Sequence, residues 1–284
     1  MSTYYEELKK RESIPEIEIN KGQPNLLFNQ KTYNSINEIF KEPQNPKISI
    51  HERALKFFED VLYCEDIKET LYRLILQKDR KMNVLLIGPA ACSKTMLCRI
   101  IEDGTNGTVF FDATASSGAG LIEVLRENPR AKIVIIDEIS EMKKNDIEVL
   151  RGLLADGRIS KTLKTTRINL KMENVKIIAT CNNPSKLSIP IRSRFIELAM
   201  DAYTDDEFRD IMVFLMVKQN IVNEYLARQI ADTFLFYNIT NVRKALSIAL
   251  LISPDDKIED IRRNIENIIY NDGSGVNHNY NIIS

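Results

Sequence analysis

The fold of this chain is decided by residues 84–98, which read VLLIGPAACSKTMLC. The stretch begins with the apolar run Val84–Ile87, continues through the small residues of Gly88–Ser93, and enters a helical pattern at Lys94. A buried strand, a small-residue loop and Lys-Thr at a helix start are the arrangement of a phosphate-binding P-loop. Such a loop surrounds phosphates with backbone N–H groups, and the helix N-terminus favours negative charge. The stretch therefore predicts a nucleoside triphosphate site.

The loop also predicts individual roles. We expect Lys94 to neutralise the phosphates and the Thr95 hydroxyl to hold Mg²⁺. Ser93 stands where the pattern has glycine, so reduced ATP affinity is one expectation. An ordinary strand-to-helix turn with a chance Lys-Thr pair is the alternative that the loop alone leaves open. The residues expected to bind ATP here form one run: Gly88, Pro89, Ala90, Ala91, Cys92, Ser93, Lys94, Thr95 and Met96.

A second apolar run ends in two carboxylates. Residues 133–138 read IVIIDE, so Asp137 and Glu138 should emerge at the carboxyl edge of the sheet, where open α/β sheets bind ligands. We expect Asp137 to hold Mg²⁺ and Glu138 to orient and polarise the attacking water. A solvated helix start is the alternative for this pair. Its position downstream of the P-loop favours the catalytic interpretation.

Around these two runs, strand-like and helix-like patterns alternate. A helical pattern over His51–Gln77 comes first. Strands alternating with helices indicate an α/β domain with a mostly parallel sheet. The remaining predicted strands are Val109–Phe111 and Val175–Ala179, and the predicted helices between strands are Lys94–Glu102, Ala119–Asn128 and Lys144–Leu154.

Beyond Met200 the strand signal stops. Thr204 to Glu207 is a capping-box pattern that opens a helix, and further helices are predicted at Asn223–Phe236, Thr240–Ile252 and Ile258–Ile269. We therefore expect a nucleotide-binding domain over 51–202 and an all-helical lid domain over 203–270. Residues 1–50 are an extension of unknown role with a short helix near Ser35–Lys41, and 271–284 are expected to be a disordered tail.

Composition excludes several function classes. With 44% hydrophobic and 28% charged residues, the chain is neither wholly disordered nor a collagen-like or coiled-coil rod. Its net charge of −1 means that any contact with a polyanion must be local. No apolar run is long enough to span a membrane, and the N-terminus has no secretory signal. The cysteines lack CxxC spacing, which argues against a zinc site, and we expect a cytoplasmic protein.

Taken together, the motifs resemble the AAA+ ATPases over roughly residues 54–255. Residues 58–68, FEDVLYCEDIK, resemble the segment that lines the adenine pocket in that family, with Tyr63 in place of the usual glycine. Residues 179–184, ATCNNP, resemble sensor 1, which implies that Asn182 lies between Glu138 and the γ-phosphate. The resemblance implies ATP and Mg²⁺ as cofactors.

Two arginine-bearing segments extend the resemblance. Residues 189–195, IPIRSRF, resemble the arginine-finger segment, with Arg194 as the finger and Arg192 as a second candidate. Residues 241–246, NVRKAL, resemble sensor 2, with Arg243 reaching the phosphates. A finger implies a homo-oligomeric ring, a hexamer in this family, because it completes a neighbour's site. The simpler alternatives are a turn cap for Asn182, a surface ion pair for Arg194 and a solvated helix position for Arg243.

A basic hairpin narrows the resemblance. Arg158–Lys164 and Arg167–Lys171 predict two short strands, like the hairpin of the AAA+ branch that contains RuvB, MoxR-type chaperones and minichromosome-maintenance helicases. Archaeal RuvB-like ATPases are especially similar. The resemblance places this hairpin in the central channel, where Lys161, Lys164 and Arg167 would attract phosphate backbones. A solvated hairpin that only prevents aggregation is the alternative. The winged helix of RuvB has no counterpart after Ile252.

The leading hypothesis is therefore an oligomeric, Mg-ATP-hydrolysing motor that acts on nucleic acid, as a DNA helicase or translocase. One alternative is a MoxR-type protein-remodelling ATPase with a protein adaptor. A second alternative is an ATP-binding scaffold in which Ser93 and Tyr63 weaken turnover.

Overall fold

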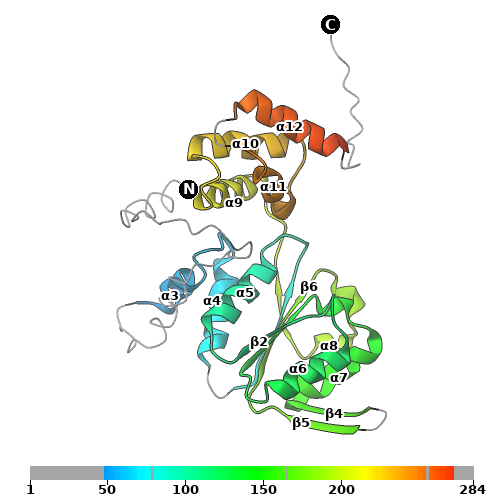
Figure 1. Ribbon diagram of the computed structural model, residues 1–284. Coiled ribbons are helices and arrows are strands. Elements are labelled where there is room, and N and C mark those ends of the chain that lie inside the picture. Colours follow the sequence, from blue (N-terminus) through cyan, green and yellow to red (C-terminus); the bar gives the residue numbers. More distant parts are fainter. Residues whose placement is uncertain (1–47, 78–79, 164–165, 254–255, 272–284) are drawn as a thin grey trace. The chain divides into compact units, whose positions relative to one another are not determined.

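The computed structural model describes residues 48–77, 80–163, 166–253 and 256–271, and it contains a five-stranded parallel sheet with helices on both faces (Figure 1). The spatial order of the strands is β2-β3-β6-β1-β7, and every neighbouring pair is parallel. The predicted α/β class is confirmed. The strands are β1 (Asn83–Ile87), β2 (Thr108–Asp112), β3 (Ile133–Asp137), β6 (Lys176–Cys181) and β7 (Ile196–Ala199).

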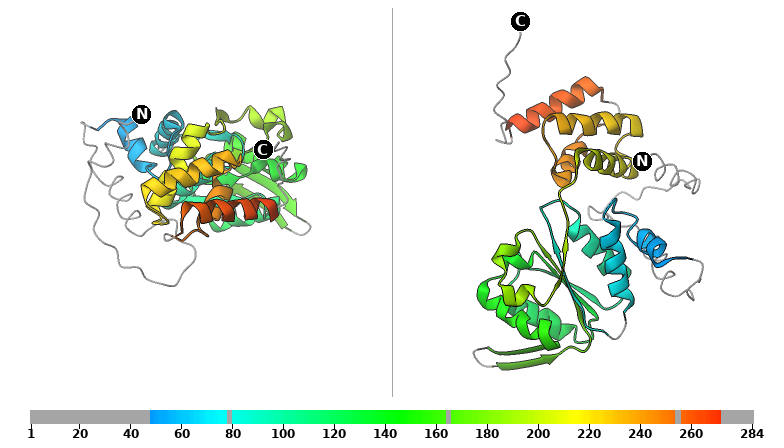
Figure 2. Two further views of the ribbon diagram at one scale, coloured as in Figure 1. Left: turned by 90° about the horizontal axis from the view of Figure 1, so that it is seen from above. Right: turned by 180° about the vertical axis from the view of Figure 1, so that it is seen from behind.

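Helices cover the two faces of the sheet. Figures 1 and 2 show α4 (Glu65–Leu76) and α5 (Lys94–Gly104) on one face, and α6 (Gly118–Glu127) and α7 (Lys144–Asp156) on the other. All residues of β3 and β6 are buried, as are all but the last of β1. Strands covered on both faces are apolar throughout rather than alternating. The unbroken apolar runs in the sequence therefore predicted these strands correctly.

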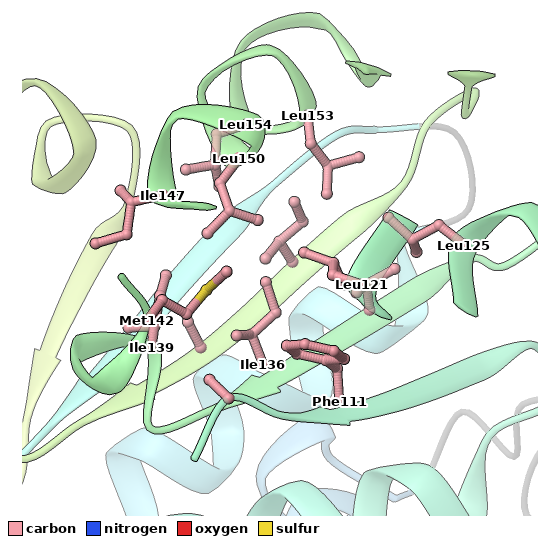
Figure 3. Packing of buried hydrophobic residues seen from close by; sticks show 14 of the residues in the cluster. Phe111, Leu121, Leu125, Ile136, Ile139, Met142, Ile147, Leu150, Leu153 and Leu154 are labelled. Carbon is pink, nitrogen blue, oxygen red and sulfur yellow. The ribbon is translucent and has the colours of Figure 1, made fainter. Parts of the chain in front are cut away.

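The larger hydrophobic core lies between the sheet and the pair α6 and α7. Figure 3 shows side chains from both helices packed over Phe111 and Ile136 of the strands. Full burial of such a side chain contributes about 1.5–3 kcal/mol relative to exposure. This packing fixes α7, whose C-terminus leads into a separate two-stranded hairpin. The helix residues in the figure include Leu121, Leu125, Ile147, Leu150, Leu153 and Leu154.

The predicted hairpin is present. Strands β4 (Arg158–Leu163) and β5 (Thr166–Lys171) pair antiparallel, with Arg158 opposite Lys171 and Leu163 opposite Thr166. Gly157 ends α7 in the left-handed conformation, with φ +76°. This residue lets the chain turn directly from the helix into β4.

Some elements before the C-terminal helices differ from the sequence predictions. The helical pattern over His51–Gln77 is interrupted, giving α3 (Ile50–Phe57) and α4, because Tyr63 and Cys64 adopt left-handed conformations with φ 63° and 55°. The edge strand β7 and the short helix α8 (Ile189–Arg192) were not predicted. Both have only four residues, and β7 is mostly exposed, so neither produces a strong hydrophobic pattern.

The C-terminal helices have a hydrophobic core of their own, which includes Phe208, Ile230, Phe234, Ile261 and Ile265. The predicted capping box is confirmed, because Thr204 and Glu207 exchange side-chain-to-backbone hydrogen bonds. Helix α11 is shorter than the predicted Thr240–Ile252. The helices are α9 (Asp205–Lys218), α10 (Glu224–Phe236), α11 (Val242–Ala249) and α12 (Ile258–Asn271).

Several sequence predictions concern the chain ends. The helix predicted near Ser35–Lys41 and residues 272–284 lie outside the described residues, whereas residue 271, the first of the predicted tail, ends α12. Within the described ranges, no helix combines the length and apolarity needed to cross a membrane.

Replacing Gly157 by alanine should destabilise the protein. An added Cβ would lie 2.3 Å from the Met172 carbonyl oxygen, and a φ of +76° is sterically unfavourable for alanine. We expect Gly157→Ala to lower the free energy of unfolding by about 1–3 kcal/mol. The control is Gly120→Ala in α6, where the nearest atoms to the new Cβ lie 3.9–4.0 Å away, so no loss is expected. Urea denaturation followed by circular dichroism measures both, and equal stabilities of the two variants would contradict this account of the turn.

Candidate active site

Three adjacent strands bring the predicted site residues to one edge of the sheet. The loop with Lys94 follows β1, Asp137 and Glu138 lie at the end of β3, and Asn182 follows β6. Because β6 pairs in parallel with both β3 and β1, the carboxyl ends of all three meet.

The loop between β1 and α5 has the backbone of an anion site. Ala91 and Ser93 both adopt left-handed conformations with φ 64°, whereas Cys92 between them does not. Alternation of this kind forms a concave nest of backbone N–H groups that binds anions. The Ser93 side chain does not cap α5, so it leaves the first N–H groups of that helix, from Lys94 onward, available to a ligand. Gly88 is required because a Cβ there would lie 2.4 Å from the Met200 carbonyl oxygen.

The ammonium group of Lys94 is buried next to neutral acceptors. Its Nζ donates to the carbonyl oxygens of Gly88 at 2.8 Å and Pro89 at 2.6 Å, and to Asn182 Oδ1 at 2.8 Å. Lys94 is only 4% exposed, and no carboxylate pairs with it among the described residues. A buried cation without a counter-ion costs stability. The site therefore fits an anionic ligand such as a triphosphate.

Hard oxygen ligands for a cation lie beside the lysine. Thr95 Oγ1 donates to Asp137 Oδ1 and Oδ2 at 3.2 and 3.1 Å. Hydroxyl and carboxylate oxygens are the groups that Mg²⁺ prefers, usually together with waters and substrate phosphates. Within the described residues, no group of three or more His, Cys, Asp or Glu side chains could hold a metal without further ligands. The donor set thus fits Mg²⁺ bound together with a phosphate.

Glu138 has an unused acceptor atom. It adopts φ 54°, and its Oε2 is buried without a hydrogen-bond partner among the described residues. Burial raises the pKa of the Glu138 carboxyl, whereas the positive charge of Lys94 and a backbone hydrogen bond from Asn182 act in the opposite direction. An unpartnered carboxylate oxygen of this kind suits a role in binding a reactive water.

Thr180 is a site residue that the sequence prediction missed. Its Oγ1 donates to Asp137 Oδ1 at 2.6 Å and accepts from the backbone N–H of Glu138 at 2.8 Å. One hydroxyl therefore orients both acidic residues. The signal in the sequence is a hydroxyl residue within an otherwise apolar strand, fully buried at 0% exposed.

The two residues that replace expected glycines form hydrogen bonds to the helical domain. Both Tyr63 and Ser93 have positive φ, which explains why glycine is usual at these positions. Tyr63 Oη donates to Asp210 Oδ2 at 2.6 Å, and Tyr203 Oη donates to Ser93 Oγ at 2.7 Å. Burial is the main reason that the pKa of Tyr203 is raised to about 12. These hydroxyl groups offset part of the cost of the left-handed conformations.

The predicted arginines lie away from the loop. Arg192 binds Glu197 through two hydrogen bonds of 2.7 Å, whereas the Arg194 guanidinium donates to the Pro190 carbonyl oxygen and contacts no described carboxylate. Arg243 is exposed on α11, and its side chain has no hydrogen bond or ion pair to any residue that the structure describes. Neither Arg194 nor Arg243 therefore contacts the loop of its own chain.

Acidic residues neutralise part of the positive charge at the base of the hairpin. Arg158 pairs with Asp156 at 3.7 Å, and Lys171 pairs with Glu173 at 2.7 Å. Lys161 lies on β4 and Arg167 on β5, closer to the turn, and Lys164 is outside the described residues.

Comparisons with known proteins agree with this geometry. Residues 84–200 match the family described as ATPase family associated with various cellular activities (AAA). A mutant of Thermotoga maritima RuvB aligns at 19% identity and TM-score 0.56, covering 74% of this chain and 72% of that one. Another RuvB mutant gives 18% identity, TM-score 0.57 and coverages of 74% and 71%. The T. maritima RuvB Holliday junction branch migration motor aligns at 19% identity and TM-score 0.54, covering 72% of this chain and 70% of that one. No curated protein matches the chain.

A loop of this shape after β1, with acidic residues at the end of β3, defines a P-loop NTPase fold. More narrowly, residues 84–200 match the model of the AAA ATPase family, and the sheet with its helices has the AAA+ fold seen in RuvB. The narrower resemblance to archaeal RuvB-like or MoxR-type ATPases stays a prediction.

Removing either hydroxyl of the Ser93–Tyr203 hydrogen bond should weaken the same interaction. In a double-mutant cycle of Ser93→Ala and Tyr203→Phe, we expect a coupling energy of about 0.5–1.5 kcal/mol, because the bond is partly buried. Thermal and urea denaturation supply the free energies. Tyr225→Phe, on an exposed tyrosine, is the control and should change stability by less than about 0.5 kcal/mol. Strictly additive losses would show that the bond does not stabilise the fold.

Proposed function

We propose that this protein is an oligomeric ATPase that hydrolyses Mg-ATP to drive movement on nucleic acid. The observation that carries the proposal is the convergence of three groups at one site. They are a buried Lys94 that pairs with no described carboxylate, the Thr95–Asp137 pair, and a Glu138 oxygen without a hydrogen-bond partner among the described residues. These groups provide, at one sheet edge, a cation for phosphates, oxygen ligands for Mg²⁺ and an acceptor for water.

Each residue of the site would contribute a separate step. The loop Gly88–Ser93 and the α5 N-terminus would bind the phosphates, with Lys94 held in place by Asn182. Thr95 and Asp137 would hold Mg²⁺, which when bound neutralises charge that develops on the phosphates. Glu138 would accept a hydrogen bond from the attacking water at Oε2, while Thr180 holds its backbone N–H and the Asn182 N–H holds its carboxylate. Tyr63 would lie beside the adenine of ATP.

The proposal includes assembly into a homo-oligomeric ring, with the hexamer as its expected form. Arg194 would complete the site of the neighbouring subunit, since Arg192 is already bound to Glu197 and Arg194 is not paired with a described carboxylate. Arg243 would approach the phosphates through movement of the lid. The proposal also includes a nucleotide-binding domain over 51–202 and a lid domain over 203–270, which the start of α9 at Asp205 supports. It further includes residence in the cytoplasm, which the four free thiols support.

Glu138→Gln should retain ATP binding and lose turnover. The amide preserves shape but cannot polarise water, so we expect hydrolysis to fall about 10²–10⁴-fold while the affinity for a fluorescent ATP analogue changes little. Glu141→Gln is the matched control, because the exposed Glu141 carboxylate forms an ion pair with Lys186 and with no other described residue, and this variant should hydrolyse ATP like the wild type. Phosphate release measures turnover, and a Glu138→Gln variant with wild-type turnover would exclude this role.

The pH profile provides a second readout of the same residue. Because the pKa of Glu138 is raised above its ordinary value of 4.5, its ionised form is lost as pH falls through a range above 4.5. Hydrolysis should therefore decline on the acidic side at a higher pH than an ordinary carboxylate would cause, and the residual rate of Glu138→Gln should lack this limb.

Replacing Lys161, Lys164 and Arg167 together by alanine should abolish stimulation of ATP hydrolysis by nucleic acid. Basal hydrolysis should stay within about two-fold of the wild type, because phosphate-backbone binding depends on these charges and the catalytic edge does not. The matched control, Arg158→Ala with Lys171→Ala, removes charges that are already paired with acidic residues. It should therefore lose less of the stimulation by nucleic acid than the triple variant does. Filter binding to single-stranded, duplex and branched DNA and to RNA is measured across salt concentrations. A wild type with no salt-sensitive binding would favour the protein-remodelling alternative.

A further inference from the structure

Asn83 is a buried polar residue at the amino end of β1, the end opposite the P-loop. It is 8% exposed, and the rest of the strand is apolar. Its side-chain Nδ2 donates to two backbone carbonyl oxygens, that of Leu154 at 3.1 Å and that of Arg194 at 2.9 Å. Because both partners are acceptors, the amide nitrogen, and not the oxygen, must face them.

The two carbonyl groups belong to segments with separate proposed tasks. Leu154 lies in the last turn of α7, which passes through Gly157 into β4 of the hairpin. Arg194 lies between α8 and β7 and is the proposed finger. A single amide therefore joins the base of the hairpin-bearing helix, the central strand and the finger segment.

We propose that Asn83 is a positioning residue that fixes Arg194 for the site of the neighbouring subunit. This inference rests on the proposed function, since it assigns Asn83 a task only if Arg194 acts in a neighbour's site.

The hydrogen bonds of Arg194 support this assignment. Its N–H donates to Ile191 O, and its guanidinium donates to Pro190 O, so both bonds stay within the Ile189–Phe195 segment. Among the described residues, the bond from Asn83 is the one hydrogen bond that joins Arg194 to the sheet. Phe195 adds packing against the core, which holds the segment down but does not determine the direction of the Arg194 carbonyl. Removing the amide would release the Arg194 carbonyl, although β7 remains paired with β1 from Ile196 onward.

The remaining atom of the amide argues against a purely stabilising role. Asn83 Oδ1 is buried without a hydrogen-bond partner among the described residues. A buried unsatisfied acceptor costs stability, and an apolar residue, as in the rest of β1, would avoid that cost. The two donated bonds are what an apolar residue could not provide.

Lys81 provides a matched comparison. Its Nζ donates to the Leu153 carbonyl oxygen at 2.6 Å, so it joins the residues just before β1 to the same turn of α7, and among the described residues its side chain forms no hydrogen bond to Arg194. Lys81→Met thus removes one bond to α7 and leaves the bond to the finger in place.

Mixing of full-length variants distinguishes a defect in the neighbour's site from a defect in the subunit's own site. Asn83→Ala alone should lower ATP hydrolysis about 10–100-fold, the effect expected of a misplaced catalytic group, with ATP binding unchanged. Mixed with Glu138→Gln, it should regain activity, because some interfaces combine an intact Glu138 with an intact finger. Mixed with Arg194→Ala, it should regain none, because no subunit then offers a well-placed finger. Lys81→Met should hydrolyse ATP like the wild type.

Other outcomes overturn the inference. Wild-type turnover of Asn83→Ala, or rescue by Arg194→Ala but not by Glu138→Gln, would show that Asn83 does not act through the finger. An equal loss in Lys81→Met would show that the attachment to α7 is what matters. If Asn83→Ala does not fold, as judged by circular dichroism, Asn83→Leu retains the volume without the donors and replaces it. A fully active Arg194→Ala would remove the proposed finger itself, and this inference with it.

Discussion

The buried ammonium group of Lys94 determines much of the geometry around it. Its Nζ lies among two loop carbonyls and the amide oxygen of Asn182, and a cation buried in this way is costly unless an anion binds beside it. Holding the cation there requires the loop to turn closely around it. That turn requires a residue without Cβ at Gly88 and left-handed conformations at Ala91 and Ser93. It also requires β6 beside β1, because this pairing places Asn182 within reach of the lysine.

The residues at the two usual glycine positions, Ser93 in the P-loop and Tyr63 just before α4, attach these two segments to the C-terminal part of the chain. A glycine would adopt positive φ without strain, whereas Tyr63 and Ser93 each take part in a hydroxyl hydrogen bond that reaches Asp210 or Tyr203. The conformation of the loop is therefore coupled to the position of the helical domain through side chains. In the proposed function, movement of that domain would break or restore these bonds, so that strain in the loop depends on the position of the domain.

The sequence predicted the parts of the site that depend on local pattern. Continuous apolar runs identify strands buried on both faces, and Lys94, Thr95, Asp137 and Glu138 follow from their places at strand ends. It could not predict contacts between distant segments. The bonds of Asn83 to Leu154, of Tyr203 to Ser93 and of Thr180 to Asp137 each depend on how strands and loops are placed in three dimensions. Edge strand β7 was missed for another reason, since it is short and mostly exposed.

The two ends of β1 serve different parts of the proposed mechanism. Its carboxyl end leads into the loop with Lys94, and its amino end carries Asn83, which holds the Arg194 backbone. Because β1 is almost entirely buried and pairs with both β6 and β7, the separation of its ends is fixed by the sheet. The residues for a subunit's own site and for its neighbour's site would then be held by one rigid element. In the proposed function, movement would then arise outside the sheet, in the hairpin that follows α7 and in the helices that follow β7.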